Sequence, residues 1–113
     1  MSFNYGVMQG RLSTVVNNKI QAFPEKYWKT EFSKAKKLGL KSIEWTLDYK
    51  NLHKNPIFSK KGQIIIKKLS KKYSVKINSL TGDCFMQKPF WKNKNNKKLI
   101  DDLKKIIDSC KKL

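Results

Sequence analysis

The sequence predicts an α/β fold in which three short strands and three helices alternate along the chain. Three observations lead to this prediction: apolar runs of strand length, a segment with helical periodicity after each run, and a lysine-rich motif that recurs where each helix is expected to end. The expected strands cover residues 4–9, 40–47 and 75–80. Such alternation is typical of parallel strands joined by crossover helices that cover the sheet.

The first helix is expected between Pro24 and Gly39. Proline suits the first helical position, and glycine can adopt the left-handed conformation that ends a helix. Apolar residues at three- and four-residue steps predict one buried stripe: Trp28, Phe32, Ala35 and Leu38.

The second helix is expected over residues 61–73 and the third over residues 95–113. The isoleucine run at residues 64–66 also fits a strand by propensity, but the lysines after it favour a helix. The inward residues of the second helix are expected to be Ile65, Ile66, Leu69 and Tyr73. The apolar face of the third is expected to hold Leu99, Leu103, Ile106, Ile107 and Cys110, with Asp101, Asp102 and Asp108 among lysines elsewhere.

A similar lysine-containing motif ends each expected helix: Ala35-Lys36-Lys37-Leu38, Ser70-Lys71-Lys72-Tyr73 and Cys110-Lys111-Lys112-Leu113. The segments recur at intervals of about 35 to 40 residues, which fits one strand plus its crossover helix. The helix-to-strand turns are short, whereas the strand-to-helix loops at 11–23, 48–60 and 81–94 are long. Long loops at the carboxyl ends of parallel strands are where barrel enzymes hold their sites.

Side chains alternate between the two faces of the second strand. Ile43, Trp45 and Leu47 are expected to face the helices. The opposite face is expected to carry Ser42, Glu44, Thr46 and Asp48.

Four side chains near the strand ends are candidates for substrate binding: Gln9, Arg11, Glu44 and Asp83. Arg11 is the only arginine among 26 basic residues, and its planar fork suits a phosphate or carboxylate, although an ion pair with Glu44 is the structural alternative. Glu44 is a candidate acid/base group or sugar ligand, or else a buried acid satisfied by a neighbouring strand. For Asp48, capping of the next loop is the favoured interpretation.

The loop after the third strand carries Gly82, which permits a sharp turn and would direct Asp83 into the mouth of the sheet. Its aromatic residues, Phe85, Phe90 and Trp91, either cover a substrate or seal the top of the fold. A nucleophilic role is not expected for Cys84, because the only histidine, His53, lies in another loop and reads as a surface residue.

The formal net charge of +18 raises nucleic acid as a partner. The basic residues are almost all lysine, however, and they are spread over every expected helix, so we expect solvated helix faces and consider a nucleic-acid partner unlikely. The two cysteines lack metal or redox spacing and are expected to be reduced. No segment approaches the roughly 18 apolar residues of a membrane helix, and no signal peptide is evident, so a cytoplasmic location without a membrane partner is expected.

Several segments together resemble a known family. They are Gly6-Val7-Met8-Gln9-Gly10-Arg11-Leu12-Ser13, Ile20-Gln21-Ala22-Phe23-Pro24, Glu31-Phe32 with Ala35, Leu38-Gly39-Leu40, and Ile43-Glu44-Trp45 with Asp48 and Asn55-Pro56. The chain resembles the opening of sugar phosphate isomerase/epimerases of the xylose-isomerase-like TIM barrel superfamily. The Met-Gln-Gly-Arg-Leu-Ser run is the most specific part of the match.

The resemblance implies a (β/α)8 barrel of which residues 1–113 form the N-terminal three units. It also implies a divalent metal, Mn²⁺ or Mg²⁺, that assists proton transfer through an enediolate. In that family the metal ligands come from later strands, so no metal is expected on this chain alone and no catalytic residue is assigned. Gln9, Arg11, Glu44 and Asp83 carry over as positions that contact a sugar or sugar phosphate.

Three parallel strands would leave an open edge and an uncovered apolar inner face, both of which a barrel of about 250 residues closes. The chain alone is therefore expected to be inactive and to associate with a C-terminal complement or with itself. A gene fragment, a split gene or a partly expressed chain would each fit. The alternative functions are a fragment of an apurinic-site endonuclease, disfavoured because no histidine follows the third strand, and a basic nucleic-acid-binding module.

Overall fold

The computed structural model describes residues 4–14, 22–89 and 97–113. Its elements are β1 (Gly6–Met8), α1 (Trp28–Lys37), β2 (Ser42–Thr46), the 3₁₀ turns η1 (Leu52–Lys54) and η2 (Pro56–Phe58), α2 (Lys60–Tyr73), β3 (Lys76–Thr81), α3 (Asp83–Gln87) and α4 (Lys97–Lys111). The strands form one sheet in the order β1-β2-β3, and both pairs are parallel. The predicted alternation of parallel strands with helices is confirmed; the short helix α3 lies inside a segment that was predicted to be a loop.

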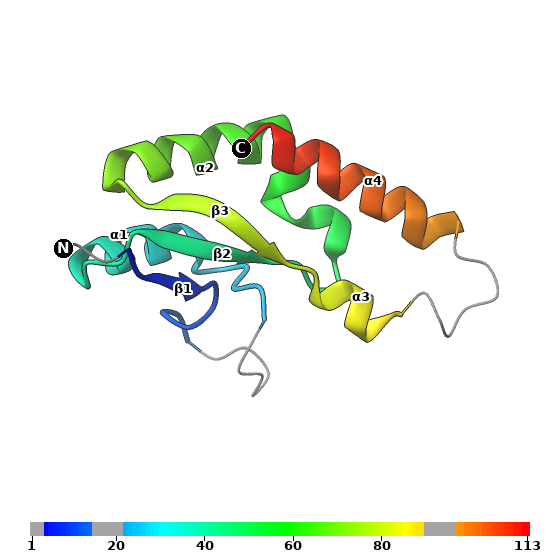
Figure 1. Ribbon diagram of the computed structural model, residues 1–113, viewed down its shortest axis with the longest axis horizontal. Coiled ribbons are helices and arrows are strands. Elements are labelled where there is room, and N and C mark those ends of the chain that lie inside the picture. Colours follow the sequence, from blue (N-terminus) through cyan, green and yellow to red (C-terminus); the bar gives the residue numbers. More distant parts are fainter. Residues whose placement is uncertain (1–3, 15–21, 90–96) are drawn as a thin grey trace.

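One core lies between the sheet and the helices. Ile43, Trp45 and Leu47 of the second strand segment are fully buried in it, as the alternation of side chains predicts. Phe32 of α1, Ile66 of α2 and Ile106 of α4 belong to the same cluster. Figure 1 shows α1 behind β2, with α2 and α4 on the β3 side of the molecule.

The helix α1 begins at Trp28 and not at Pro24. The carbonyl of Pro24 accepts hydrogen bonds from the N–H groups of Tyr27 and Trp28, so these residues form a turn that leads into the helix. The prediction that Leu38 is buried is wrong: it follows the last helical turn and is 65% exposed. Gly39 has φ +75°, the left-handed conformation predicted for it.

The helix α4 is rotated relative to the sequence-based prediction. Its buried residues are Leu99, Asp102, Ile106 and Ser109, whereas Ile107 and Cys110 are exposed. Asp102 was expected on the solvated face, but its Oδ1 lies 3.3 Å from Nε2 of His53. This contact with the loop after β2 turns the acidic side chain inward.

The face of the sheet opposite the helices is mainly polar. The register places Met8 beside Glu44 and Ser79, and Thr46 beside Thr81. The expectation of an uncovered apolar inner face is therefore wrong, because serine, threonine and glutamate occupy most of its positions. A hydroxyl-rich face is more easily solvated, and it offers hydrogen-bonding groups to a polar ligand.

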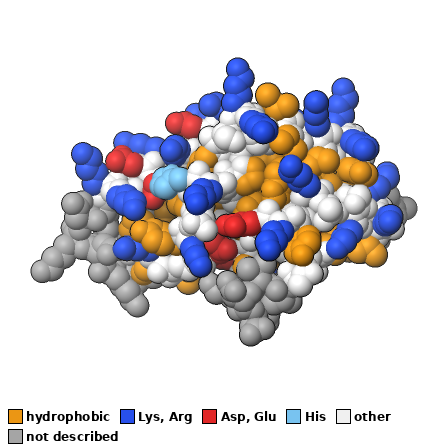
Figure 2. Space-filling model, turned by 180° about the vertical axis from the view of Figure 1, so that it is seen from behind, with side chains coloured by type: hydrophobic (Ala, Val, Ile, Leu, Met, Phe, Trp, Pro, Cys, Tyr) orange, Lys and Arg blue, Asp and Glu red, His pale blue; other side chains and the backbone are white. Residues whose placement is uncertain are grey.

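Lysine side chains are spread over the surface. Figure 2 shows them across one face, separated by apolar and uncharged side chains and not gathered in one stripe. None of the helices in the described ranges is long and apolar enough to cross a membrane.

Candidate functional site

The carboxyl ends of the three strands meet at one edge of the sheet because all of them run in the same direction. Gln9 and Arg11 follow β1, Glu44 lies within β2, and Asp83 begins α3 two residues after β3. The structure thus brings the four candidate residues to the same half of the sheet. Their burial differs: Gln9 is buried, Glu44 and Asp83 are half-buried, and Arg11 is exposed.

Gln9 is the most constrained of these residues. Its side chain is 1% exposed, and its Oε1 accepts a hydrogen bond of 2.9 Å from the backbone N–H of Thr46. Its own N–H donates to the carbonyl of Glu44, also at 2.9 Å, which extends the pairing of β1 with β2. The amide group therefore links the ends of the two strands.

Two buried polar atoms at this link have no hydrogen-bond partner in the described structure. They are Nε2 of Gln9 and Oγ1 of Thr46. A buried donor without a partner costs roughly 1–3 kcal/mol, so native proteins rarely leave one. Ser13 Oγ and Asp102 Oδ2 also lack a partner in the described ranges, but only Gln9 Nε2 and Thr46 Oγ1 lie together at the link between two strand ends.

The turn after β1 is held by a carboxylate from α1. The two oxygens of Glu31 accept hydrogen bonds from the N–H of Gly10 at 3.0 and 2.9 Å, and Oε2 accepts a third from Leu12 N at 3.1 Å. Lys34 Nζ donates to the carbonyl of Leu12 at 2.9 Å. Burial raises the pKa of Glu31, and the hydrogen bonds from Gly10 and Leu12 oppose that rise.

Glycine is required at position 10 within this turn. Gly10 has φ +96°, and a Cβ built there would lie 2.6 Å from the carbonyl oxygen of Ala22. Because the turn cannot shift without breaking these contacts, it fixes where the chain leaves β1 and hence the position of Gln9. No role is predicted for Glu31 from the sequence; the available signal is an acidic residue on the buried stripe of α1, next to Phe32.

Within the described ranges of the chain, Arg11 and Glu44 do not form the ion pair that was the structural alternative to a binding role. Arg11 is exposed at the rim, and Glu44 is half-buried beside Ser79 in the register of the sheet. Both side chains are thus accessible near the strand ends.

Cys84 follows Asp83 at the start of α3 and is 1% exposed. Burial raises the pKa of its thiol to about 11, so the thiol is protonated at neutral pH. This agrees with the expectation that it is not a nucleophile. Phe85 packs against the core, and Phe90 and Trp91 lie outside the described residues.

Asp48 connects the loop after β2 to the loop after β1 and to the end of α3. Its Oδ2 accepts a hydrogen bond from Phe23 N at 2.9 Å, and its Oδ1 accepts one from Gln87 Nε2 at 3.3 Å. Gln87 in turn accepts from Tyr49 N at 2.7 Å through its Oε1. The Asp48 carboxylate therefore holds the loop after β1 and the end of α3, and the interpretation that it caps the next loop is wrong.

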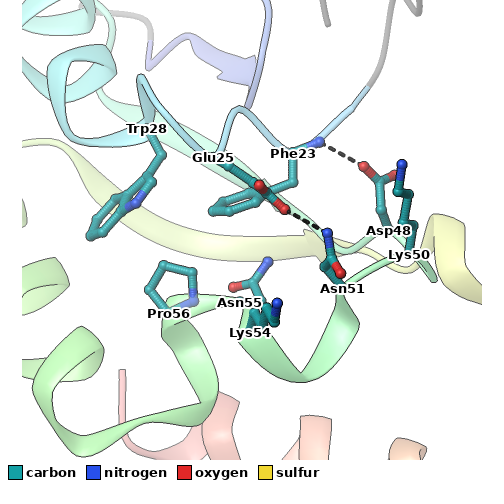
Figure 3. A pocket seen from close by; sticks show the side chains of 9 residues that line it. All are labelled: Phe23, Glu25, Trp28, Asp48, Lys50, Asn51, Lys54, Asn55 and Pro56. Carbon is teal, nitrogen blue, oxygen red and sulfur yellow. Dashed lines mark hydrogen bonds between the residues drawn. The ribbon is translucent and has the colours of Figure 1, made fainter. Parts of the chain in front are cut away.

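A cavity of about 200 Å³ lies between the loops after β1 and β2, on the helix-facing side (Figure 3). Phe23 and Trp28 form its aromatic wall and contact Trp45 with ring centroids 5.7 and 5.6 Å apart. Glu25 and Asn51 are joined across it by a hydrogen bond of 3.3 Å. None of the four candidate residues lines this cavity.

The described residues contain no group of three or more His, Cys, Asp or Glu side chains that could hold a metal ion. The donor set of this part of the chain therefore does not fit the divalent metal that the resemblance implies. Comparison with family models, with curated proteins and with solved structures finds no match to this chain.

Proposed function

We propose that this chain forms the first three βα units of a xylose-isomerase-like barrel in the cytoplasm and supplies part of the binding wall for a sugar or sugar phosphate. The enzyme would be an isomerase or epimerase. The observation that carries the proposal is the pair of buried atoms without partners, Gln9 Nε2 and Thr46 Oγ1, at adjacent strand ends. The parallel order β1-β2-β3 and the Met-Gln-Gly-Arg-Leu-Ser run support it.

A sugar suits these atoms because each of its hydroxyls can both donate and accept a hydrogen bond. One hydroxyl would accept from Gln9 Nε2, and the same or a neighbouring one would pair with Thr46 Oγ1. Arg11, exposed at the rim, would bind a phosphate group through its fork. Glu44 and Asp83 would accept from further hydroxyls.

The complete reaction would move a proton at a carbon next to a carbonyl group. The described residues do not supply a metal site, so we assign this chain a role in binding and orienting the substrate only. The remaining groups would come from a C-terminal complement, and the chain alone would be inactive.

Backbone amide shifts, measured by NMR on the labelled chain, test the proposed sugar site. The probes are glucose 6-phosphate, fructose 6-phosphate, the two unphosphorylated sugars and inorganic phosphate. We expect a sugar phosphate to shift the amides of Gln9, Arg11 and Thr46. Gln9→Leu should weaken that binding about tenfold or more, because it removes the amide that would donate.

Gln87→Leu is the matched control, because it makes the same chemical change in another glutamine that holds a loop. It should leave sugar binding unchanged. If no sugar moves these amides at millimolar concentration, or if inorganic phosphate alone reproduces the whole effect, the proposed sugar site is wrong.

The net charge of +18 supports one competing function, a nucleic-acid-binding module. Filter binding to a DNA duplex at several salt concentrations separates the two. A dedicated module would bind tightly with a steep salt dependence. Weak binding that disappears near physiological salt would leave the sugar-binding proposal in place.

A further inference from the structure

The cavity of about 200 Å³ between the loops after β1 and β2 has an apolar end and a charged end. Figure 3 shows Trp28 and Pro56 at one end and Asp48 and Lys50 at the other, with Glu25 between the two ends. A second hollow of about 300 Å³ adjoins the charged end, because Asp48 and Lys50 line both. A small ligand that is apolar at one end and charged at the other would match this distribution.

One wall of the cavity is held in place by the side chain of Asn55, which is 5% exposed. Its Oδ1 accepts hydrogen bonds from Trp45 Nε1 at 2.9 Å and from Ile57 N at 3.2 Å. Its Nδ2 donates to the carbonyl of Thr46 at 3.3 Å. Because these bonds are made within the chain, the wall is formed before any ligand binds, and a preformed site loses less entropy on binding.

Charges of both signs line the cavity and are open to a ligand. In the described part of the chain the Glu25 carboxylate accepts one hydrogen bond, from Asn51 Nδ2 at 3.3 Å. Lys50 and Lys54 form no ion pair within the described ranges. Asp48 is less available, because both of its oxygens already accept hydrogen bonds. One carboxylate and two ammonium groups can therefore each pair with an opposite charge on a ligand.

The combination of charges decides which class of ligand fits. A purely anionic ligand would meet Glu25 and a purely cationic one would meet Lys50 and Lys54, and like charges across a binding site are unfavourable. A free amino acid carries an ammonium group and a carboxylate on one carbon, so it can use both signs at once. An apolar side chain on the same carbon would pack against the aromatic wall of Phe23 and Trp28.

We propose that this cavity binds a free α-amino acid with an apolar side chain. The ammonium group of the ligand donates to Glu25, its carboxylate pairs with Lys50 and Lys54, and its side chain contacts the aromatic wall. This goes beyond the proposed function, since none of the four candidate sugar-binding residues lines the cavity. Amino acid binding is thus measurable without any sugar, and its failure would leave the proposed sugar site untouched.

NMR titration of the isotope-labelled chain with four small molecules tests the proposal. They are L-phenylalanine, phenethylamine, which lacks the carboxylate, hydrocinnamate, which lacks the ammonium group, and glycine, which lacks the apolar side chain. We expect L-phenylalanine to shift the indole N–H of Trp28 and the backbone amide of Asn51. The other three should bind at least about threefold more weakly, because each has lost one of the proposed contacts.

Two variants separate the charged contacts. Glu25→Gln should weaken L-phenylalanine and phenethylamine about threefold or more and should not weaken hydrocinnamate. Lys50→Gln with Lys54→Gln should weaken L-phenylalanine and hydrocinnamate and should not weaken phenethylamine. Lys36→Gln with Lys37→Gln is the matched control, because these exposed residues of α1 lose the same charge away from the cavity. The control should change each affinity less than about twofold, since charges beyond a Debye length are screened.

Four results would overturn the proposal. If L-phenylalanine leaves the Trp28 indole unmoved at millimolar concentration, the cavity does not bind it. Hydrocinnamate or glycine binding as tightly as L-phenylalanine would show that the ammonium group or the apolar side chain contributes nothing. Equal weakening by the two lysine double variants would mean attraction by bulk charge only. Displacement of L-phenylalanine by glucose 6-phosphate would make the cavity part of the proposed sugar site.

Discussion

Thr46 is the residue at which stability and ligand binding are expected to oppose each other. Its hydroxyl is buried without a partner, while its backbone N–H is held by Gln9. An unsatisfied buried hydroxyl destabilises the folded state, and the sugar proposed above would give it a partner. A threonine with a purely structural role would not show this opposition between stability and ligand binding.

Thr46→Val should raise the free energy of unfolding by about 1 kcal/mol, because it replaces the unpaired hydroxyl with a methyl group of similar size. The same variant should weaken sugar binding. Urea unfolding and NMR titration measure the two effects. Thr30→Val is the control: its exposed hydroxyl donates to Tyr27 O, so its loss should not stabilise the protein. A Thr46→Val protein that is less stable would contradict this account.

Glu31 gives the folded chain a pH dependence whose sign follows from its burial. Burial raises its pKa above the ordinary value of 4.5, against the opposing hydrogen bonds from Gly10 and Leu12. The folded protein therefore keeps the proton to higher pH than the unfolded chain does. The stability linked to this group is fully present below pH 4.5 and is lost as the pH rises through the folded pKa.

Glu31→Gln should remove this contribution and flatten the fall in unfolding free energy above pH 4.5. Urea unfolding at several pH values measures the slope for both proteins. Glu25→Gln, a change at an exposed acid, should keep the slope of the unmodified protein. An unchanged slope in Glu31→Gln would show that another group is responsible.

At the scale of whole elements, the helix ends depend on left-handed residues. Gly39 follows α1 with φ +75°, whereas α2 ends at Ser74 with φ 54°. A residue with a Cβ is strained in this conformation, and glycine is not. The two helices therefore use the same backbone geometry, with different residues at the equivalent position.

Ser74→Gly should stabilise the chain by about 1 kcal/mol, because it relieves the strain at the end of α2. Ser70→Gly, one turn earlier, is the control and should destabilise by about 0.5 kcal/mol through its helix propensity. Thermal or urea unfolding distinguishes the two changes. Loss of stability in both variants would mean that the Ser74 side chain contributes a contact that outweighs its backbone strain.

The element order was predictable, but some boundaries and faces were not. Periodicity identified α1, α2 and α4 and the inward residues of α2. It could not anticipate the turn made by Pro24 or the rotation of α4, because both depend on partners in other segments. The contact between His53 and Asp102 is an example. Nothing in the sequence pairs these two residues, because the loop after β2 meets α4 only in the folded chain.

At the scale of the whole molecule, the charge of +18 acts against the compact state, since lysines spread over the surface repel one another. Adding sodium chloride from about 10 to about 200 mM should therefore raise the urea midpoint by screening that repulsion. A variant with several surface lysines changed to glutamine should respond less. A midpoint that falls with salt would show that attractive ion pairs dominate.

The sequence by itself determined the α/β class, the parallel strands and the burial of alternate residues on β2, because hydrophobic periodicity is a local property of the chain. Only the tertiary structure decided which polar groups meet. Gln9 reaches Thr46 across 37 positions and Glu31 reaches Gly10 across 21. Gln9 Nε2 and Thr46 Oγ1 likewise lack a partner only because packing excludes water from them. The sequence does not show this, since the burial of a polar group depends on segments that meet only on folding.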